Sequence, residues 1–283
     1  MPSLKEIKNR VGSVQNTLKI TSAMKLVASS KLHRAQQAIE AMRPYEKALL
    51  DILSHLPAVE GAAPRADESR GEGGTALVAF ASNSSLCGAF NANAVRKALQ
   101  QTGEVPGPVT VFSIGRKMAD AMKKTGHPSP ADYSAVAERP AYAPMADLAE
   151  SLMEAFAEGR YSRVVLVYNH FVSTARQEPV VETLLPLAAV AGQEDASPLP
   201  PDVILEPSAE ELIKALRPKS VKLRLYAALL DSVAAEHAAR TVAMQMATDN
   251  GNDLLQELVL QYNKSRQQKI TSEILDLAGG QQQ

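Results

Sequence analysis

Few side chains in the sequence have types and spacing that could support catalysis. Glu236 and His237 are adjacent and would combine a carboxylate with an imidazole for acid–base chemistry. Neighbouring residues of a helix point about 100° apart, so this pair does not form a dyad by itself. We therefore expect it to make structural hydrogen bonds or interface contacts. The single cysteine, Cys87, has no histidine or other base close in sequence, which favours a small buried or interface residue over a nucleophile.

Metal and phosphate sites are also missing from the sequence pattern. The five histidines are scattered, with no His-x3-His pair and no cysteine ligands nearby. Neither the P-loop pattern nor the G-x-G-x-x-G pattern of dinucleotide sites occurs. Residues 82–91 resemble a phosphate cradle only loosely, because they contain one glycine, Gly88, and no lysine or arginine. We expect a tightly packed turn there, and no cofactor, metal ion or nucleotide bound to this chain.

The composition indicates a helix-rich protein. Its 283 residues suffice for one large domain or two modest ones, and 45% are hydrophobic, only 4% aromatic. The net charge of −1 provides no global field that would attract nucleic acid or acidic lipid. A single cysteine allows no internal disulfide, which fits a reducing compartment. The first ten residues are charged and lack the apolar segment of a secretory signal, and no apolar run approaches the length of a membrane span.

The N-terminal stretch has the repeat of a two-helix seam. From residue 4 to residue 42 the apolar positions step by three and four over more than five heptads, which predicts a long coiled-coil helix. Pro44 is expected to kink or locally break this helix, and the stripe resumes before Pro57. The predicted seam consists of Leu4, Ile7, Val11, Val14, Leu18, Thr21, Lys25, Ala28, Leu32, Ala35, Ile39 and Met42, followed by Leu49, Leu53 and Leu56.

Charge in this helix has one sign, because residues 7–39 contain no aspartate or glutamate. Two interpretations stay open: a solvated helix face, or a surface that runs along an acidic partner. Nucleic acid is a weaker candidate partner, since the charges are widely spaced and no aromatic residues lie between them. The basic residues are Lys8, Arg10, Lys19, Lys25, Lys31 and Arg34.

The last third of the chain is expected to form one helix from about Ser220 to Ala278, after a short separate helix between Pro207 and Pro218. At 1.5 Å per residue this helix would be about 90 Å long, too long for a domain of this size to bury. It therefore needs another helix beside it or a partner around it, and the simplest way to pair it with the N-terminal helix is antiparallel. Its predicted stripe consists of Leu223, Tyr226, Leu230, Val233, Met244, Ala247, Leu254 and Leu258, with His237 and Arg240 also at stripe positions.

The distal part of this helix changes character twice. Residues 261–269 are nearly devoid of apolar side chains, and apolar residues then return. A surface that is first polar and then apolar again suits a shaft gripped by one partner element and then by another. The returning apolar residues are Ile270, Ile274, Leu275 and Leu277.

Between the two helical regions, short apolar runs alternate with amphipathic segments, which indicates an α/β sheet with parallel crossovers, Rossmann-like in type. The last two strands are joined by a short polar segment and should form an antiparallel hairpin at the sheet edge. We expect four regions: a coiled-coil helix (1–57), a linker (58–74), the α/β domain (75–207) and a C-terminal helical region (208–283). The predicted strands are 75–81, 109–114, 163–169 and 179–187, with a last short strand at 203–206 after a proline-rich loop. The predicted helices are 91–101, 116–124 and 145–158.

Both ends of the chain carry long motifs, and the full length resembles the gamma-subunit family of F-type ATP synthases, the central shaft of a rotary motor. The N-terminal motif is KEIKNRVGSVQNTLKITSAMKLVASSKLHRAQ (residues 5–36), and the C-terminal motifs are EHAARTVAMQMATDNGNDLL (236–255) and ELVLQYNKSRQQKITSEI (257–274). The closing I-T-x-E-x-x-D pattern of the family is present at residues 270–276. One departure is the turn at residues 83–88, NSSLCG in place of the usual D-R-G-L-C-G type.

This resemblance implies an antiparallel coiled coil inside a ring of alpha and beta subunits, with the α/β domain beside the epsilon subunit and on the membrane c-subunit ring. Catalysis would belong to the beta subunits, and proton flow through the c ring would turn the shaft. A bacterial form is implied, peripheral to the cytoplasmic face of the inner membrane. Partner contacts are implied for Lys8, Arg10, Lys19, Met24, Lys25 and Lys31 with the beta lever, for Arg266, Gln267, Asn263 and Lys264 with the beta catch loop, and for Ile270, Ile274 and Leu277 in an apical apolar sleeve.

Two other functions compete with the rotary shaft. Composition and periodicity alone fit a non-catalytic coiled-coil tether with an α/β ligand-binding domain equally well. The polar break followed by an apolar tip favours the shaft, because a free tether gains nothing from that order. An α/β enzyme with helical arms is disfavoured, because no acid, base or phosphate site assembles in the sequence.

Overall fold

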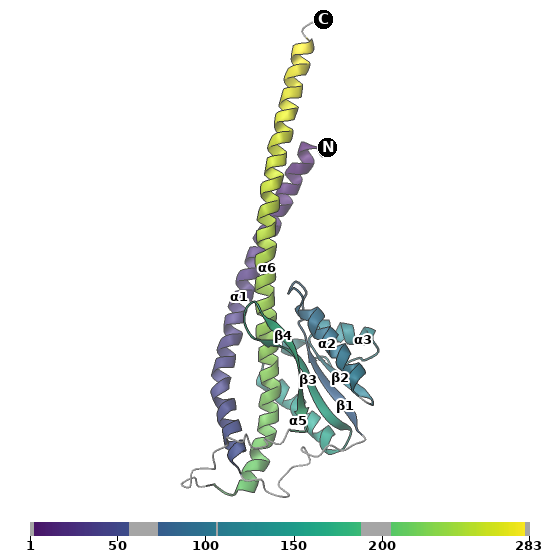
Figure 1. The fold of residues 1–283 in the computed structure, drawn as a ribbon, viewed down its shortest axis with the longest axis vertical. Helices are drawn as coiled ribbons and strands as arrows, with labels where there is room; N and C mark the ends of the chain where they lie inside the picture. The colour runs from purple at the N-terminus through teal and green to yellow at the C-terminus, as the bar shows by residue number, and fades with distance from the viewer. Residues whose placement is uncertain (1–2, 57–72, 106, 188–204, 281–283) are drawn as a thin grey trace.

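Two long helices and one small α/β domain make up the structure, a computed structural model that describes residues 3–56, 73–105, 107–187 and 205–280. Helix α1 (Leu4–His55) and helix α6 (Ala209–Gly280) lie side by side, and α6 extends well past the N-terminal end of α1 (Figure 1). The α/β domain packs against the lower half of α6. The predicted fold class, an antiparallel coiled coil plus a Rossmann-like domain, is confirmed.

Both long helices begin with a Ser-x-x-Glu sequence that satisfies free backbone N–H groups of the first turn. Ser3 Oγ accepts a hydrogen bond from the N–H of Glu6 at 3.2 Å, and Ser208 Oγ accepts one from the N–H of Glu211 at 3.3 Å. The helix start predicted near Ser208 is therefore correct.

The prolines do not divide the helices, which corrects two predictions. Pro44 lies inside the continuous helix α1, and Pro218 lies inside α6, so no separate short helix precedes the long one. A proline removes one backbone hydrogen bond and crowds the preceding turn. Here apolar residues on both sides of each proline are anchored in the core, for example Ile213 and Val221 around Pro218. The free energy gained by packing along the whole helix thus outweighs the tendency of proline to end it.

The seam of α1 is confirmed, because all twelve predicted heptad positions from Leu4 to Met42 are buried or half-buried. Two hydrogen bonds fix an antiparallel register with α6. Thr21 Oγ1 lies 2.9 Å from Thr248 Oγ1, and Lys25 Nζ donates to Gln245 Oε1 at 2.7 Å.

One position of the α6 stripe is wrong: Leu254 is 45% exposed, and Leu255 is turned toward the seam instead. The seam passes through Thr248 and Gly251, which a search for apolar side chains overlooks. Gly251 receives the side chain of Leu18, and a Cβ on it would lie 2.7 Å from Leu18 Cδ2. The helix therefore keeps its heptad phase by placing a glycine, Gly251, where α1 presents the large Leu18.

The α/β domain contains a four-stranded sheet in the order β2-β1-β3-β4. Strand β1 is parallel to both neighbours, and β4 pairs antiparallel with β3 at the edge, as predicted. Helix α4 was not predicted, and α5 begins three residues earlier than expected. The range 203–206 lies mainly outside the described residues. The elements are β1 (Gly74–Phe80), α2 (Phe90–Glu104), β2 (Val109–Ile114), α3 (Arg116–Lys124), α4 (Ser134–Glu138), α5 (Tyr142–Ala157), β3 (Tyr161–Phe171) and β4 (Gln177–Leu185).

Each face of the sheet has its own core, since successive strand residues point to opposite sides. Leu77 and Ala79 face α2 and α3, whereas Ala76, Val78 and Phe80 face α5 and α6. Helix α6 therefore forms the coiled coil with α1 and also covers one face of the sheet. Its residues 221–238 are buried on nearly all sides for this reason.

Candidate functional site

The free end of α6 presents the polar segment predicted as a partner contact. Asn263, Lys264, Arg266 and Gln267 are all exposed. The antiparallel register set by Thr21 and Thr248 puts them level with the start of α1. Within the same segment Tyr262 and Ser265 are half-buried. The structure thus brings the four polar residues together on one accessible length of helix.

Beyond this segment the tip is apolar and uncovered. Ile270 is 44% exposed, Ile274 60% and Leu275 64%. Leu277 belongs to α6, but its side chain lies outside the described residues. Large apolar side chains gathered on an exposed helix end are typical of an interaction surface.

The basic residues of α1 do not share one face. Arg10, Met24 and Lys31 are separated by multiples of seven and so lie along one edge of the helix. Lys8 and Lys19 occupy other positions, and all four of these cations are exposed whereas Met24 is half-buried. Positive charge is therefore spread around the exposed surface of α1.

Lys25 differs from the other lysines because it is half-buried in the seam. Its ammonium group donates to Gln245 of α6 at 2.7 Å, so part of its hydrogen-bonding capacity is used within the chain.

The turn after β1 uses its polar groups internally, as expected for a packed turn. The Oδ1 of Asn83 accepts a hydrogen bond from the N–H of Arg116 at 2.9 Å, and its Nδ2 donates to the carbonyl oxygen of Ser134 at 2.7 Å. Asn91 Oδ1 accepts from the N–H of Ser82 at 3.0 Å. Asn83 thus caps helix α3, whose N-terminus lies at the carboxyl edge of the sheet, where α/β proteins often bind ligands.

Glu236 forms a buried ion pair with Arg240 rather than a dyad with His237. The Arg240 Nη1 to Glu236 Oε1 distance is 2.5 Å, and both side chains are about nine-tenths buried. Burial raises the pKa of Glu236 above its usual value. Burial, together with the charges of Arg240 and Lys31, lowers the pKa of His237 to about 4. The expected structural role of this pair is therefore confirmed.

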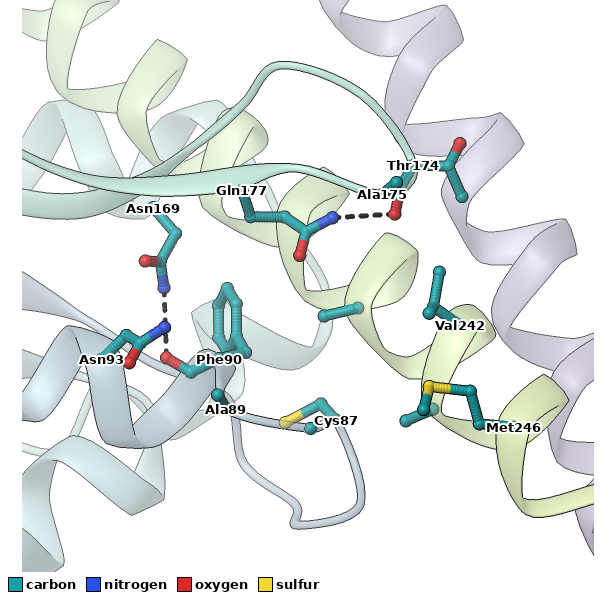
Figure 2. A pocket seen from close by; sticks show the side chains of 13 residues that line it. Cys87, Ala89, Phe90, Asn93, Asn169, Thr174, Ala175, Gln177, Val242 and Met246 are labelled. Carbon is teal, nitrogen blue, oxygen red and sulfur yellow. Dashed lines mark hydrogen bonds between the residues drawn. The ribbon is translucent and has the colours of Figure 1, made fainter. Parts of the chain in front are cut away.

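Cys87 lies beside a cavity of about 180 Å³ between the β1–α2 turn, the β3–β4 hairpin and α6 (Figure 2). Its side chain is 1% exposed, and Asn91 Nδ2 donates to the sulfur at 3.2 Å. Burial raises the pKa of the thiol, which keeps it protonated and poorly nucleophilic. The cavity walls are mostly apolar, with Phe90, Val242 and Met246 around the opening shown in Figure 2.

A second polar cluster joins α1, α6 and the sheet. Arg224 donates to Glu182 of β4 at 2.5 Å and to Glu46 of α1 at 3.1 Å. Nearby, His170 Nδ1 lies 2.5 Å from Asp231 Oδ2. No sequence pattern indicates this imidazole–carboxylate pair, because its members are 61 residues apart and on different elements. Within the described part of the chain no hydroxyl or thiol is hydrogen-bonded to that imidazole, so it lacks a nucleophile.

Neither a metal centre nor a membrane span occurs in the described residues. No group of three or more histidine, cysteine, aspartate or glutamate side chains there is arranged to hold a metal ion. No helix in the same residues is both long enough and apolar enough to cross a bilayer.

Comparison with known proteins accounts for the whole chain. A family profile described as ATP synthase matches residues 3–282. The ATP synthase gamma chain of Bacteroides fragilis is 48% identical over 99% of both chains. The chain belongs to the gamma-chain family of ATP synthases. The gamma chain of Flavobacterium johnsoniae is also similar, at 44% identity over 99% of this chain and 98% of its own length.

Solved structures share the gamma-chain fold at lower identity. One chain of the Euglena gracilis mitochondrial ATP synthase, solved as OSCP/F1/c-ring, has a TM-score of 0.63 at 19% identity, covering 98% of this chain and 93% of its own. A chain of the Tetrahymena thermophila central stalk/c-ring structure has a TM-score of 0.57 at 23% identity, covering 81% of this chain and 99% of its own. The resemblance noted in the sequence is therefore confirmed at the level of the family and the fold.

Proposed function

We propose that this chain is the central-stalk rotor subunit of an F-type ATP synthase and transmits rotation of the c-subunit ring to the catalytic beta subunits. The observation that carries this proposal is the free end of α6, which extends past α1 and changes from a polar to an apolar surface. A helix that protrudes from its own fold with exposed isoleucines is stabilised by a surrounding partner. A ring of alpha and beta subunits would provide one.

The partners follow from the two ends of the molecule. The coiled coil and its tip would lie inside the ring of alpha and beta subunits. The α/β domain would contact the epsilon subunit and the c-subunit ring, placing the chain peripherally on the cytoplasmic face of the bacterial membrane. Catalysis would belong to the beta subunits. In this chain, Glu236 is buried in an ion pair with Arg240, and burial favours the protonated thiol of Cys87. These surroundings suit a structural role rather than a reactive one.

Individual contacts of this rotor are proposed for the exposed residues. Asn263, Lys264, Arg266 and Gln267 would meet the beta catch loop, and Ile270, Ile274 and Leu277 would turn in the apical sleeve. The beta lever would meet the basic surface of α1. Exposed ion pairs contribute only about 0.2–1 kcal/mol each, which suits contacts that break at every step. The residues proposed to meet the lever are Lys8, Arg10, Lys19, Met24, Lys25 and Lys31.

The deciding experiment is reconstitution of the full chain with alpha and beta subunits of a bacterial ATP synthase. We expect one copy of the chain in each assembled ring and cooperative ATP hydrolysis that differs from that of the ring alone. Failure to join the ring, or hydrolysis with unchanged cooperativity, would contradict the rotor function. A free tether would give that second result.

Lys25 offers a test of the lever contact that needs a matched control. Lys25→Glu reverses the charge but also alters the hydrogen bond to Gln245 inside the coiled coil. Lys25→Gln removes the charge and keeps a polar group at the same place. We expect ATP-driven rotation to be impaired more by Lys25→Glu than by Lys25→Gln. Equal rotation in both variants and the wild type would remove Lys25 from the lever contact.

A further inference from the structure

Arg240 connects the shaft to the α/β domain through the turn that follows β1. Its Nη2 donates to Ser84 Oγ at 2.9 Å and, more weakly, to the carbonyl oxygen of Ser85 at 3.4 Å. These partners are more than 150 residues away in sequence and belong to a different part of the fold. The contact therefore joins two bodies rather than stabilising a local segment.

The guanidinium is held from the α6 side by Glu236. Arg240 is only 8% exposed, and its Nη1 donates to Glu236 Oε1 at 2.5 Å, one helical turn earlier. One nitrogen thus bonds to the helix and the other to the turn. Because the guanidinium is planar and its donors are fixed in a fork, it constrains both the distance and the rotation between these two partners.

The turn itself is rigidly attached to the domain. Asn83 bridges helix α3 and the carbonyl oxygen of Ser134, and Asn91 holds the start of the turn at Ser82. A force applied by Arg240 to Ser84 is therefore transmitted to the sheet and its helices.

Arg240 also lies near the level where α6 leaves the sheet. Residues 221–238 of α6 pack on both the sheet and α1, whereas farther along the helix Gln245 and Thr248 hydrogen-bond to α1. Arg240 follows the sheet-packed residues and precedes Gln245, so it lies at the level where the coiled coil leaves the domain, called the neck below. A helix packed by apolar contacts alone can rotate slightly about its axis, but a bidentate side chain at the neck opposes that rotation.

We propose that Arg240, held by Glu236, is a positioning residue that locks the rotational angle of the coiled coil relative to the α/β domain. The consequence for energy transfer rests on the proposed rotor function. Torque that enters through the α/β domain would pass this neck before it reaches the tip of α6. The lock itself is a property of the chain alone and is tested without its partners.

The test measures distances across the neck in the full chain. Spin labels are attached at Asp120→Cys on α3 and Asp253→Cys on α6, both exposed positions, in a Cys87→Ala background. Arg240→Lys keeps the positive charge beside Glu236 but loses the fork, and Ser84→Ala removes one acceptor on the exposed turn. For Arg240→Lys we expect the label–label distance distribution to broaden about two-fold, with a smaller broadening for Ser84→Ala.

Arg224→Lys is the matched control, because Arg224 also bonds α6 to the sheet but lies below the neck, where the helix is packed on the sheet as well. This variant should keep the wild-type distribution. A wild-type distribution in Arg240→Lys, or equal broadening in Arg224→Lys, would overturn the assignment. Thermal midpoints within about 2 °C of wild type for Ser84→Ala would separate loosening of the neck from loss of stability, since surface substitutions change stability little.

A second experiment distinguishes failure of the proposed lock from failure of the proposed rotor function. In the reconstituted synthase, Arg240→Lys should lower the yield of ATP per proton more than it lowers the rate of ATP hydrolysis. If the wild-type chain fails to assemble, the rotor function fails while the distance measurement still decides on the lock. If assembly succeeds and the distances do not change, only the lock is rejected.

Discussion

Polar side chains of the long helices fall into two groups that differ in burial. Glu236 and Arg240 are buried and fully engaged with each other and with the β1–α2 turn. Arg266 and Gln267 are exposed on the free end of α6. Removing a member of the first group leaves a buried charge without its partner and lowers the free energy of unfolding, whereas removing a member of the second changes mainly what the chain can bind.

The second group gives a prediction about partner binding. Replacing Arg266 and Gln267 together by alanine should leave the free energy of unfolding of the chain within about 0.5 kcal/mol of wild type, because both side chains are exposed. In the reconstituted complex the rate of ATP hydrolysis should fall. A second double variant, Asn263→Ala with Lys264→Ala, tests the neighbouring positions of the same proposed contact. Unchanged hydrolysis in both double variants would show that this segment does not contact the beta catch loop.

His237 gives a prediction about pH. Its pKa is lowered from 6.5 to about 4 by burial and by the charges of Arg240 and Lys31. Between these values the unfolded chain binds a proton that the native chain does not, so the free energy of unfolding falls as the pH is lowered. The loss for one such group is about 2–3 kcal/mol. His237→Gln should remove this part of the acid sensitivity, measured by urea unfolding at pH 7 and pH 4.5.

Two features make this pH measurement specific. Burial raises the pKa of Glu236, whose contribution to the pH dependence has the opposite sign, and Glu236 is present in both the variant and the wild type. His33→Gln serves as the control, because His33 is exposed on α1. Identical loss of stability at low pH in His237→Gln and wild type would refute the role of His237.

At the scale of elements, the joint between β2 and α3 depends on a glycine. Gly115 has a φ of +97°, and a Cβ there would lie 2.1 Å from the carbonyl oxygen of Ala81. This close approach lets β1 and β2 end side by side with α3 starting directly after them. Gly107 also has a positive φ, +87°, but has open space around it.

Comparing alanine variants of the two glycines separates the cost of backbone strain from the cost of steric overlap. Gly107→Ala should lower the free energy of unfolding by about 1–2 kcal/mol, the cost of a left-handed conformation for a residue with a Cβ. Gly115→Ala should cost about 3 kcal/mol or more, because the strand carbonyl must also move. Urea denaturation midpoints at equal m-values provide the comparison. Equal midpoints for the two variants would contradict this account of the joint.

Elements with a strong local pattern were predicted correctly from the sequence, and elements that depend on distant contacts were not. The seam of α1, the boundaries of β2 and α3, and the edge hairpin all follow from periodicity and turn residues. The continuity of α6 through Pro218 depends on packing against the sheet and α1, which local preference does not report. The apolar stripe predicts Leu254 in the seam, but Leu254 is exposed and α1 places Leu18 opposite Gly251.

At the scale of the whole molecule, the free end of α6 contributes to binding and little to folding. A chain that ends at Lys269 should keep its free energy of unfolding within about 0.5 kcal/mol of the full chain, because the described side chains it removes are exposed. A chain that ends at Glu257 also loses Leu258, which is buried in the seam, and should lose about 2 kcal/mol or more. Chemical denaturation of both truncated chains provides the measurement.

The same truncation tests the function of the tip. The chain that ends at Lys269 should still join the ring of alpha and beta subunits but give lower torque, because the apolar tip no longer turns in the sleeve. Normal torque from this chain would remove Ile270 and Ile274 from the proposed contact.

The sequence by itself determined the class of this protein: two heptad-patterned ends, an α/β insert and motifs of the gamma-chain family. It could do so because helix periodicity and strand alternation are local properties that one chain segment expresses without the rest. Only the tertiary structure showed that Arg240 reaches the turn at Ser84 and that His170 meets Asp231. Those contacts join residues 156 and 61 positions apart, and their geometry arises from how α6 packs on the sheet. The sequence around each of these residues does not indicate which distant residue it contacts.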